Sequence, residues 1–324
     1  MLAIESDSNA AATYKQNHPY SNVIVDDIRN INDLRFTKKN RRKILFGGPP
    51  CQGFSTSNQR TRTFNNPNNW LFIESLRIVR ELQPDWVVFE NVKGVTETEK
   101  AAFLEMMVDG LKSYGYSTTW WILNAADYGV PQIRYRLFVV GSLQGIKPKK
   151  PNPTTKHYIT VEQAISDLPA LSNGASEHIM PYSSKPKSDY AAMLRGNLEK
   201  SSNHIVTKNS SYVIERYKHV PPGGNWENIP AKLMNNYRDR TRCHTGIYYR
   251  LKRHKPSIVI GNYRKNMLIH PTQNRGLSVR EAARLQSFPD WYEFKGSIGF
   301  QQQQVGNAVP PLLAKCVFDT IRNS

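Results

Sequence analysis

The chain is poor in cysteine. It has only three cysteines, Cys51, Cys243 and Cys316, in 324 residues. Their separations match no metal-ligand spacing, and an odd number cannot pair completely, so neither a zinc site nor a disulfide framework is predicted. This usage is typical of a protein kept in a reducing compartment, and we expect no bound metal.

Long apolar runs are also lacking. No stretch reaches the roughly 18 apolar residues that a membrane-spanning helix needs. The opening residues, Met1-Leu2-Ala3-Ile4-Glu5, do not resemble a signal peptide. We therefore expect a soluble, cytoplasmic protein that does not enter a membrane.

Acidic residues are scarce relative to basic ones. The chain has 44 Lys and Arg residues against 26 Asp and Glu residues, a formal net charge of +18. An excess of this size favours a polyanionic partner such as nucleic acid, with an acidic lipid surface as the competing interpretation.

The periodic segments predict an α/β fold. Up to about residue 142, short apolar runs alternate with amphipathic segments, which is typical of a parallel sheet with helical crossovers. The predicted strands are Val23–Val25, Ile44–Phe46, Trp86–Phe89, Thr118–Leu123 and Leu137–Gly141, and the predicted helices are Leu71–Leu82 and Ala101–Leu111. The basic, proline-rich segment 147–153 suits a linker, and a loop-rich module follows it from about residue 172 to 270.

A glycine- and proline-rich loop directly follows the run Ile44–Phe46. It reads Gly47-Gly48-Pro49-Pro50-Cys51-Gln52-Gly53. The glycines permit a sharp turn and the prolines restrict φ, so the loop itself largely fixes the thiol of Cys51. A lone cysteine is more often a small buried apolar residue, but this setting indicates a nucleophile.

Two further segments place polar groups near the same edge of the sheet. Glu90 follows the run Trp86–Phe89, as Cys51 follows its own strand, so a nucleophile and a carboxyl group could face one pocket. A lone Glu at such a position would more often lie on the surface. In the extended segment before the strand Leu137–Gly141, alternation puts Gln132, Arg134 and Arg136 on one face. Two guanidinium groups and an amide on one face suit binding of a phosphate or a carbonyl. The alternative is a basic edge strand whose side chains are simply exposed to solvent.

Together these segments resemble the motifs of the cytosine-C5 DNA methyltransferases. The resemblance covers the nucleophile loop 46–55, the glutamate motif 90–92 and the QxRxR motif 132–136, in the family's order. Near the C-terminus, segments 275–290 and 304–311 resemble the family's ninth and tenth motifs. The resemblance implies a Rossmann-like methyltransferase domain with a second, smaller, loop-rich target-recognition domain. We expect the first at residues 1–171 plus 297–324, and the second, with the hinge, at 172–296.

The resemblance also implies a mechanism. Cys51 would attack C6 of a cytosine turned out of the duplex, Glu90 would hold N3, and Arg136, with Gln132 and Arg134 of the same motif, would help to orient the base. Adding a thiolate at C6 makes C5 able to accept a methyl group. The base must leave the stack because C6 is shielded inside it.

The family's methyl donor is S-adenosyl-L-methionine. By resemblance, Glu5 would hold the ribose hydroxyls of the donor and Asp27 and Ile28 would contact its adenine. The other expected donor-binding residues are Gly48, Pro50, Leu71 and Asn307.

One part of the family pattern is not found. The family opens with a strand and a Gly-rich loop that wraps the donor, and this chain begins about where that unit ends. We therefore expect an N-terminally short member, for which a truncated chain, a second polypeptide supplying the strand and a degenerate DNA-binding protein are three explanations.

The target-recognition region is expected within residues 172–274. Its cationic and aromatic segments suit phosphate contacts and base-edge readout on double-stranded DNA. The expected DNA-binding residues are Arg216, Lys218, Arg238, Arg240, Arg242, Arg250 and Arg253. The leading hypothesis is a prokaryotic or phage DNA (cytosine-5-)methyltransferase of a restriction-modification or orphan system, which would be nucleoid-associated through its DNA. A catalytically silent DNA-binding subunit and an RNA cytosine methyltransferase are the alternatives.

Overall fold

The computed structural model describes residues 1–324 apart from 33, 35–40, 50–70, 97–100, 238–242 and 262. The strands are β1 (Leu2–Glu5), β2 (Asn22–Val25), β3 (Ile44–Gly47), β4 (Trp86–Val92), β5 (Ser117–Asn124), β6 (Tyr135–Ser142), β7 (Met180–Pro181) and β8 (Lys200–Ser201). The α-helices are α1 (Ser8–Asn17), α2 (Leu71–Leu82), α3 (Ala101–Ser113), α4 (Val161–Ile165), α5 (Asp189–Arg195), α6 (Ser211–Lys218), α7 (Val279–Leu285), α8 (Ile298–Asn307) and α9 (Pro311–Arg322). Short 3-10 helices lie at Ile28–Asn30, Lys93–Thr96, Ala125–Tyr128, Trp226–Asn228 and Ala231–Leu233.

The central sheet has the strand order β3-β4-β6-β5. β3 and β4 are parallel, whereas β6 runs antiparallel to both β4 and β5. The prediction of an α/β fold is confirmed, but the prediction of an all-parallel sheet is wrong. Only residues 125–134 separate β5 from β6, and a parallel crossover needs a dozen residues or more. β1 and β2 pair in parallel as a separate two-stranded sheet.

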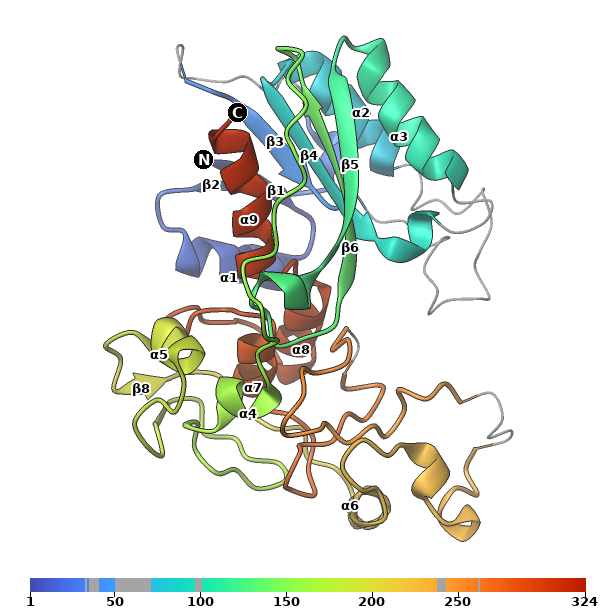
Figure 1. Ribbon diagram of the computed structural model, residues 1–324. Helices are drawn as coiled ribbons and strands as arrows, with labels where there is room; N and C mark the ends of the chain where they lie inside the picture. The colour runs from blue at the N-terminus through green and yellow to red at the C-terminus, as the bar shows by residue number, and fades with distance from the viewer. Residues whose placement is uncertain (33, 35–40, 50–70, 97–100, 238–242, 262) are drawn as a thin grey trace.

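Alternation along the strands gives the sheet two apolar faces. Val87 and Phe89 of β4 face α2 and α3, where Phe72 and Phe103 complete the cluster. On the opposite face, Trp86 and Val88 pack with side chains of α9 (Figure 1). Because successive side chains of a strand point to opposite faces, β4 is buried on both sides. The sheet is therefore a rigid platform for groups at its strand ends.

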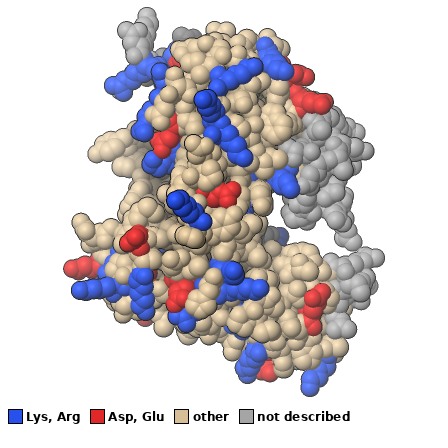
Figure 2. Space-filling view, in the orientation of Figure 1, with Lys and Arg blue, Asp and Glu red and all other residues tan. Residues whose placement is uncertain are grey.

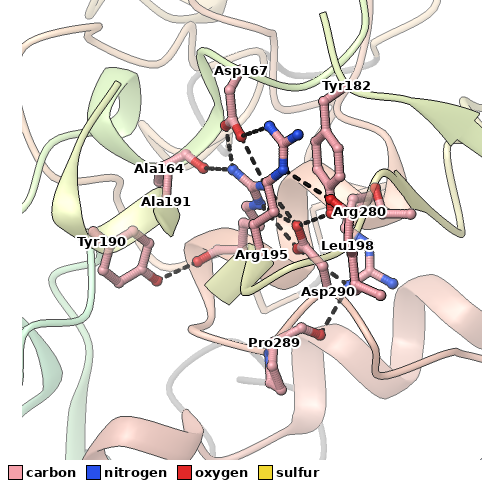
Figure 3. Close-up of polar contacts among 12 residues, drawn as sticks. Ala164, Asp167, Tyr182, Tyr190, Ala191, Arg195, Leu198, Arg280, Pro289 and Asp290 are labelled. Atoms are coloured by element: carbon pink, nitrogen blue, oxygen red, sulfur yellow. Dashed lines mark hydrogen bonds and ion pairs between the residues drawn. The ribbon is translucent and has the colours of Figure 1, made fainter. Parts of the chain in front are cut away.

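The second lobe, the lower part of the molecule in Figure 1, packs around α4, α5, α7 and α8. At its centre Arg284 pairs with Asp290 at 2.6 Å and with Asp167, and all three side chains are fully buried. Tyr182 donates a hydrogen bond of 2.7 Å to Asp290, and Figure 3 shows Asp167, Tyr182 and Asp290 in this cluster. Burial alone would raise the pKa of Asp290, but the hydrogen bonds from Arg284 lower it. The charge of Arg284 and the hydrogen bonds to Asp290 thus compensate for the burial of these groups.

The two lobes meet at α8. Arg134, just before β6, donates hydrogen bonds to the carbonyls of Gly306 at 2.9 Å and of Ala308 at 3.1 Å. Gly306 packs so closely against the backbone of Gly261 that a Cβ atom would lie 1.6 Å from its carbonyl oxygen. Glycine at 306 is thus a steric requirement of this contact. The division into domains at residues 171 and 297 stays a prediction.

Candidate active site

The ends of β3 and β4 bring two of the predicted motifs together. Gly47 lies opposite Phe89 in the parallel ladder, so Gly48 comes next to Glu90. A Cβ atom at Gly48 would lie 3.1 Å from Glu90 Oε2. Glycine at this position therefore lets the start of the loop approach the carboxyl group closely. Pro50 and Cys51 lie outside the described residues.

Glu90 is paired with Arg136 across the antiparallel ladder of β4 and β6. The distance from Arg136 Nε to Glu90 Oε1 is 2.7 Å, and the two side chains are only 12% and 17% exposed. Burial raises the pKa of Glu90, and the charges of Arg136 and Arg134 offset part of this effect. Burial also lowers the pKa of Arg136. The result is a carboxyl group at a strand end whose proton affinity is increased, which suits a group that holds or gives a proton.

Arg134 is also close to this pair, but its hydrogen bonds go elsewhere. It is 1% exposed and bonds the carbonyls of the α8 segment with Nη2. Its Nε and Nη1 atoms have no hydrogen-bond partner among the described residues. Burial, and then the neighbouring charge of Arg136, lowers the pKa of Arg134 to about 9. Arg134 thus links α8 to the surroundings of Glu90.

Gln132 makes its contacts outside the Glu90–Arg136 pair, and the expectation that it shares one face with Arg134 and Arg136 stays a prediction. β6 begins only at Tyr135, and Gln132 lies in an isolated bridge with Ser257. Its amide donates to Gln286 Oε1 at 3.0 Å and accepts from the backbone N–H of Ile260 at 3.1 Å. Gln132 is fully buried and ties the sheet to the second lobe.

Two of the predicted donor-binding residues, Glu5 and Asp27, lie at the carboxyl ends of strands. Glu5 ends β1 and accepts a hydrogen bond from the backbone of Asp7 at 2.9 Å. Asp27 follows β2 and pairs with Arg29 at 2.7 Å, and the hydrogen bonds from Arg29 lower the pKa of Asp27 to about 2. Ile28 begins a 3-10 helix, Leu71 begins α2, and Asn307 ends α8 with an exposed side chain. Their role toward a donor stays a proposal.

The predicted DNA-binding residues separate into surface and interior groups. Lys218 is exposed and pairs with Glu215 at 2.7 Å, and Arg253 is about half exposed and pairs with Glu162. Figure 2 shows Lys and Arg side chains over both lobes on the visible face. Arg238, Arg240 and Arg242 lie outside the described residues.

Arg216 and Arg250 are corrections to the predicted DNA-binding set. Arg216 is 2% exposed and donates to Leu233 O and Tyr248 Oη, each at 2.6 Å. Arg250 is 5% exposed and donates to backbone carbonyls that include Val220 O at 2.6 Å. Both guanidinium groups satisfy hydrogen-bond acceptors of the second lobe. A buried group used in this way holds loops together and cannot reach a phosphate.

Sequence reasoning assigned no role to Asn91. The structure buries its side chain between β4 and the start of the loop that leads to Cys51, where its amide donates to Pro49 O at 3.1 Å. The sequence feature that could have indicated this contact is the position of Asn91 directly after Glu90, at the end of a strand next to a proline-rich loop.

A cavity of about 410 Å³ lies in the second lobe, away from Glu90. Charged residues on its lining include Glu162, Lys187, Arg253, Arg275 and Glu281. In the part of the chain that the structure describes, no cluster of three or more His, Cys, Asp or Glu side chains could hold a metal ion. No described helix is both long and apolar enough to cross a membrane.

Comparisons with known proteins identify the family of this chain. The family model for C-5 cytosine-specific DNA methylases matches residues 1–323. Type II methyltransferase M1.HphI of Haemophilus parahaemolyticus is 35% identical over 99% of this chain and 80% of its own length. Type II methyltransferase M.DdeI of Desulfomicrobium norvegicum is 33% identical over 99% of this chain and 82% of its own length.

A solved structure has the same fold. The crystal structure described as a prophage-encoded DNA modification methyltransferase of E. coli matches with a TM-score of 0.78 and 24% identity, over 99% of this chain and 91% of that one. The comparisons give no support to a second polypeptide, which was one of the three explanations for the short N-terminus. The chain belongs to the C-5 cytosine-specific DNA methylase family and is a DNA (cytosine-5-)methyltransferase.

Proposed function

We propose that this enzyme methylates C5 of a cytosine turned out of double-stranded DNA, within a short specific sequence, through a covalent bond between Cys51 and C6. The observation that carries the proposal is the partly buried Glu90–Arg136 pair, held against the glycine that opens the Cys51 loop. A nucleophile in this loop would lie at the same sheet edge as a carboxyl group of raised pKa.

The chemistry assigns each group one task. The Cys51 thiolate forms a bond from sulfur to C6, and the electron pair displaced from the C5–C6 double bond makes C5 nucleophilic. Glu90 holds the N3 edge of the base and stabilises the charge that the addition places on the ring. Arg136 keeps the Glu90 carboxyl group in position. After methylation, loss of the C5 proton and cleavage of the sulfur–C6 bond restore the aromatic ring and the thiolate.

S-adenosyl-L-methionine is the proposed methyl donor. When bound, it supplies an electrophilic methyl group. The residues present fit such a group, because Glu5 and Asp27 offer carboxylate oxygens at the carboxyl ends of β1 and β2, where hydroxyl and amino groups of a nucleoside can be bound. Asp27 is already paired with Arg29, so Glu5 is the better candidate for the ribose hydroxyls.

The DNA would lie against the basic second lobe. Of the residues expected to contact it, Lys218 and Arg253 are described and exposed, and both suit phosphate contacts. The net charge of +18 supports a polyanionic substrate. The reading of bases is proposed for the same lobe.

The test is transfer of labelled methyl from S-adenosyl-L-methionine to mixed-sequence duplex DNA. We expect incorporation by the wild-type chain and none by Cys51→Ala. Cys316→Ala is the matched control. Cys316 lies on α9, which packs on the face of the sheet away from α2 and α3. Equal incorporation by Cys51→Ala would refute the nucleophile assignment.

The alternative proposal of a catalytically silent DNA-binding protein makes a different prediction. That alternative would be favoured if the wild-type chain binds DNA with a sequence preference but transfers no methyl group and gives no heat of S-adenosyl-L-methionine binding in calorimetry. Equal transfer to tRNA and to duplex DNA would instead favour an RNA substrate.

A further inference from the structure

The side chain of Asn91 joins the end of β4 to the loop after β3. It is 6% exposed, and its Nδ2 atom donates to Pro49 O at 3.1 Å. Its Oδ1 atom accepts from the backbone N–H of Val92 at 2.9 Å. Because both ends of the amide are engaged, its orientation is fixed by hydrogen bonds on two sides.

The backbone ladder cannot make this connection. Between β3 and β4 the paired residues run from Ile44 and Trp86 to Gly47 and Phe89. Beyond Gly48 the chain continues with Pro49 and Pro50, which have no N–H group. Pro49 and Pro50 therefore offer only their carbonyls as backbone hydrogen-bonding groups, and Asn91 provides a side-chain donor for the carbonyl of Pro49.

Asn91 is adjacent in sequence to Glu90. At the end of β4, Glu90 thus carries the carboxyl group that pairs with Arg136, and Asn91 holds the start of the Cys51 loop at Pro49. Cys51 follows Pro49 by two residues, which span about 7 Å at most. The hydrogen bond from Asn91 therefore holds the chain at a point two residues before Cys51.

We propose that Asn91 is a positioning residue that sets the path of the Cys51 loop relative to Glu90. The inference rests on the proposed function for its catalytic consequence, but the attachment of the loop can be measured independently. Asn91 acts through the loop and does not touch the reacting atoms.

The test compares Asn91→Asp with Tyr116→Phe. Asn91→Asp keeps an oxygen that accepts from Val92 but replaces the donor facing Pro49 O with a second acceptor. Tyr116→Phe is the matched control, because Tyr116 Oη donates to another proline carbonyl, Pro84 O, at 2.7 Å, just before the opposite end of β4. Asn91→Ala is the second variant, which removes the donor without adding a charge and serves if the aspartate variant does not fold.

The first readout is amide hydrogen exchange of the peptide that spans residues 44–55. Loss of one buried hydrogen bond is expected to speed exchange there roughly tenfold in both Asn91 variants, and to leave it unchanged in Tyr116→Phe. Unchanged exchange in the Asn91 variants overturns the inference, whether or not the chain transfers methyl groups.

The second readout is the single-turnover rate of methyl transfer with saturating DNA. We expect a fall of about tenfold or more in the Asn91 variants, with the DNA dissociation constant within twofold of wild type. Tyr116→Phe should keep the wild-type rate. A wild-type rate in Asn91→Ala overturns the positioning role, whereas absence of transfer by the wild-type chain contradicts the proposed function and leaves hydrogen exchange to decide on Asn91.

Discussion

Replacing Gly306 with alanine should destabilise the packing of α8 against the backbone at Gly261 within the second lobe. In a helix, glycine to alanine normally stabilises by roughly 0.5–1 kcal/mol. Here the new Cβ atom would lie 1.6 Å from the carbonyl oxygen of Gly261, so one of the two backbones must move by well over 1 Å. Overpacking of this kind costs about 1–3 kcal/mol, and we expect a net loss near the upper end of that range.

Gly299 provides the control within the same helix. Its added Cβ atom would lie 3.1 Å from Nη1 of Arg264, the far end of a flexible side chain. Gly299→Ala should therefore be neutral or slightly stabilising.

Thermal unfolding and methyl transfer are the two assays. Gly306→Ala should lower the unfolding midpoint by about 4 °C or more and should also reduce transfer, since Gly306 O accepts a hydrogen bond from Arg134. If Gly306→Ala is as stable and as active as Gly299→Ala, the argument from close packing is refuted.

Three further predictions concern charged groups. Glu90→Gln should reduce the transfer rate by roughly 10²-fold or more, because the amide cannot hold or give the proton; an initial-rate assay near the wild-type value would contradict this. Arg284→Met should lower the free energy of unfolding by about 3–5 kcal/mol, because it removes the arginine that hydrogen-bonds both buried aspartates, Asp167 and Asp290; urea unfolding measures it, and a loss below 1 kcal/mol would argue against the cluster. Burial lowers the pKa of His204 and of His270 to about 4, so below pH 6.5 the unfolded chain binds protons that the folded chain does not, and stability falls as the pH drops toward 4. The expected loss between pH 7 and pH 5 is about 2 kcal/mol for each histidine, and urea unfolding of the His204→Gln, His270→Gln double variant should lack it.

Much of the sheet could be predicted because its strands and helices have clear local signals. α2 spans Leu71–Leu82 as predicted, since its apolar residues recur at helical spacing and Pro84 follows. β4 includes the predicted run Trp86–Phe89 and extends to Val92. β1 was not predicted, because four residues ending in Glu5 carry little periodic signal.

The direction of β6 could not be predicted from alternation. Alternation tells which residues share a face but not whether the neighbouring strand is parallel. The pairing of Arg136 with Glu90 depends on this direction, because the antiparallel register sets Arg136 opposite Val92. The motif order placed both residues at the sheet edge without showing that they form an ion pair.

Burial of particular arginines was equally inaccessible to sequence reasoning. Arg216 and Arg250 lie in basic, aromatic segments that look like DNA-binding loops. Their acceptors, such as Tyr248 and His270, come from other parts of the second lobe, 17 or more residues away. Composition reports the charge of such a segment, but only the tertiary structure reports which guanidinium groups are already satisfied.

The most direct test of the account is to trap the covalent bond to DNA. Duplex DNA in which 5-fluorocytosine replaces cytosine should accumulate the adduct, because fluorine occupies the position from which a proton must leave. In the presence of S-adenosyl-L-methionine, we predict that mass spectrometry finds the modified base on the peptide that contains Cys51. An adduct on Cys243 or Cys316, or methylation of ordinary DNA without any adduct on the fluorinated duplex, would contradict the account.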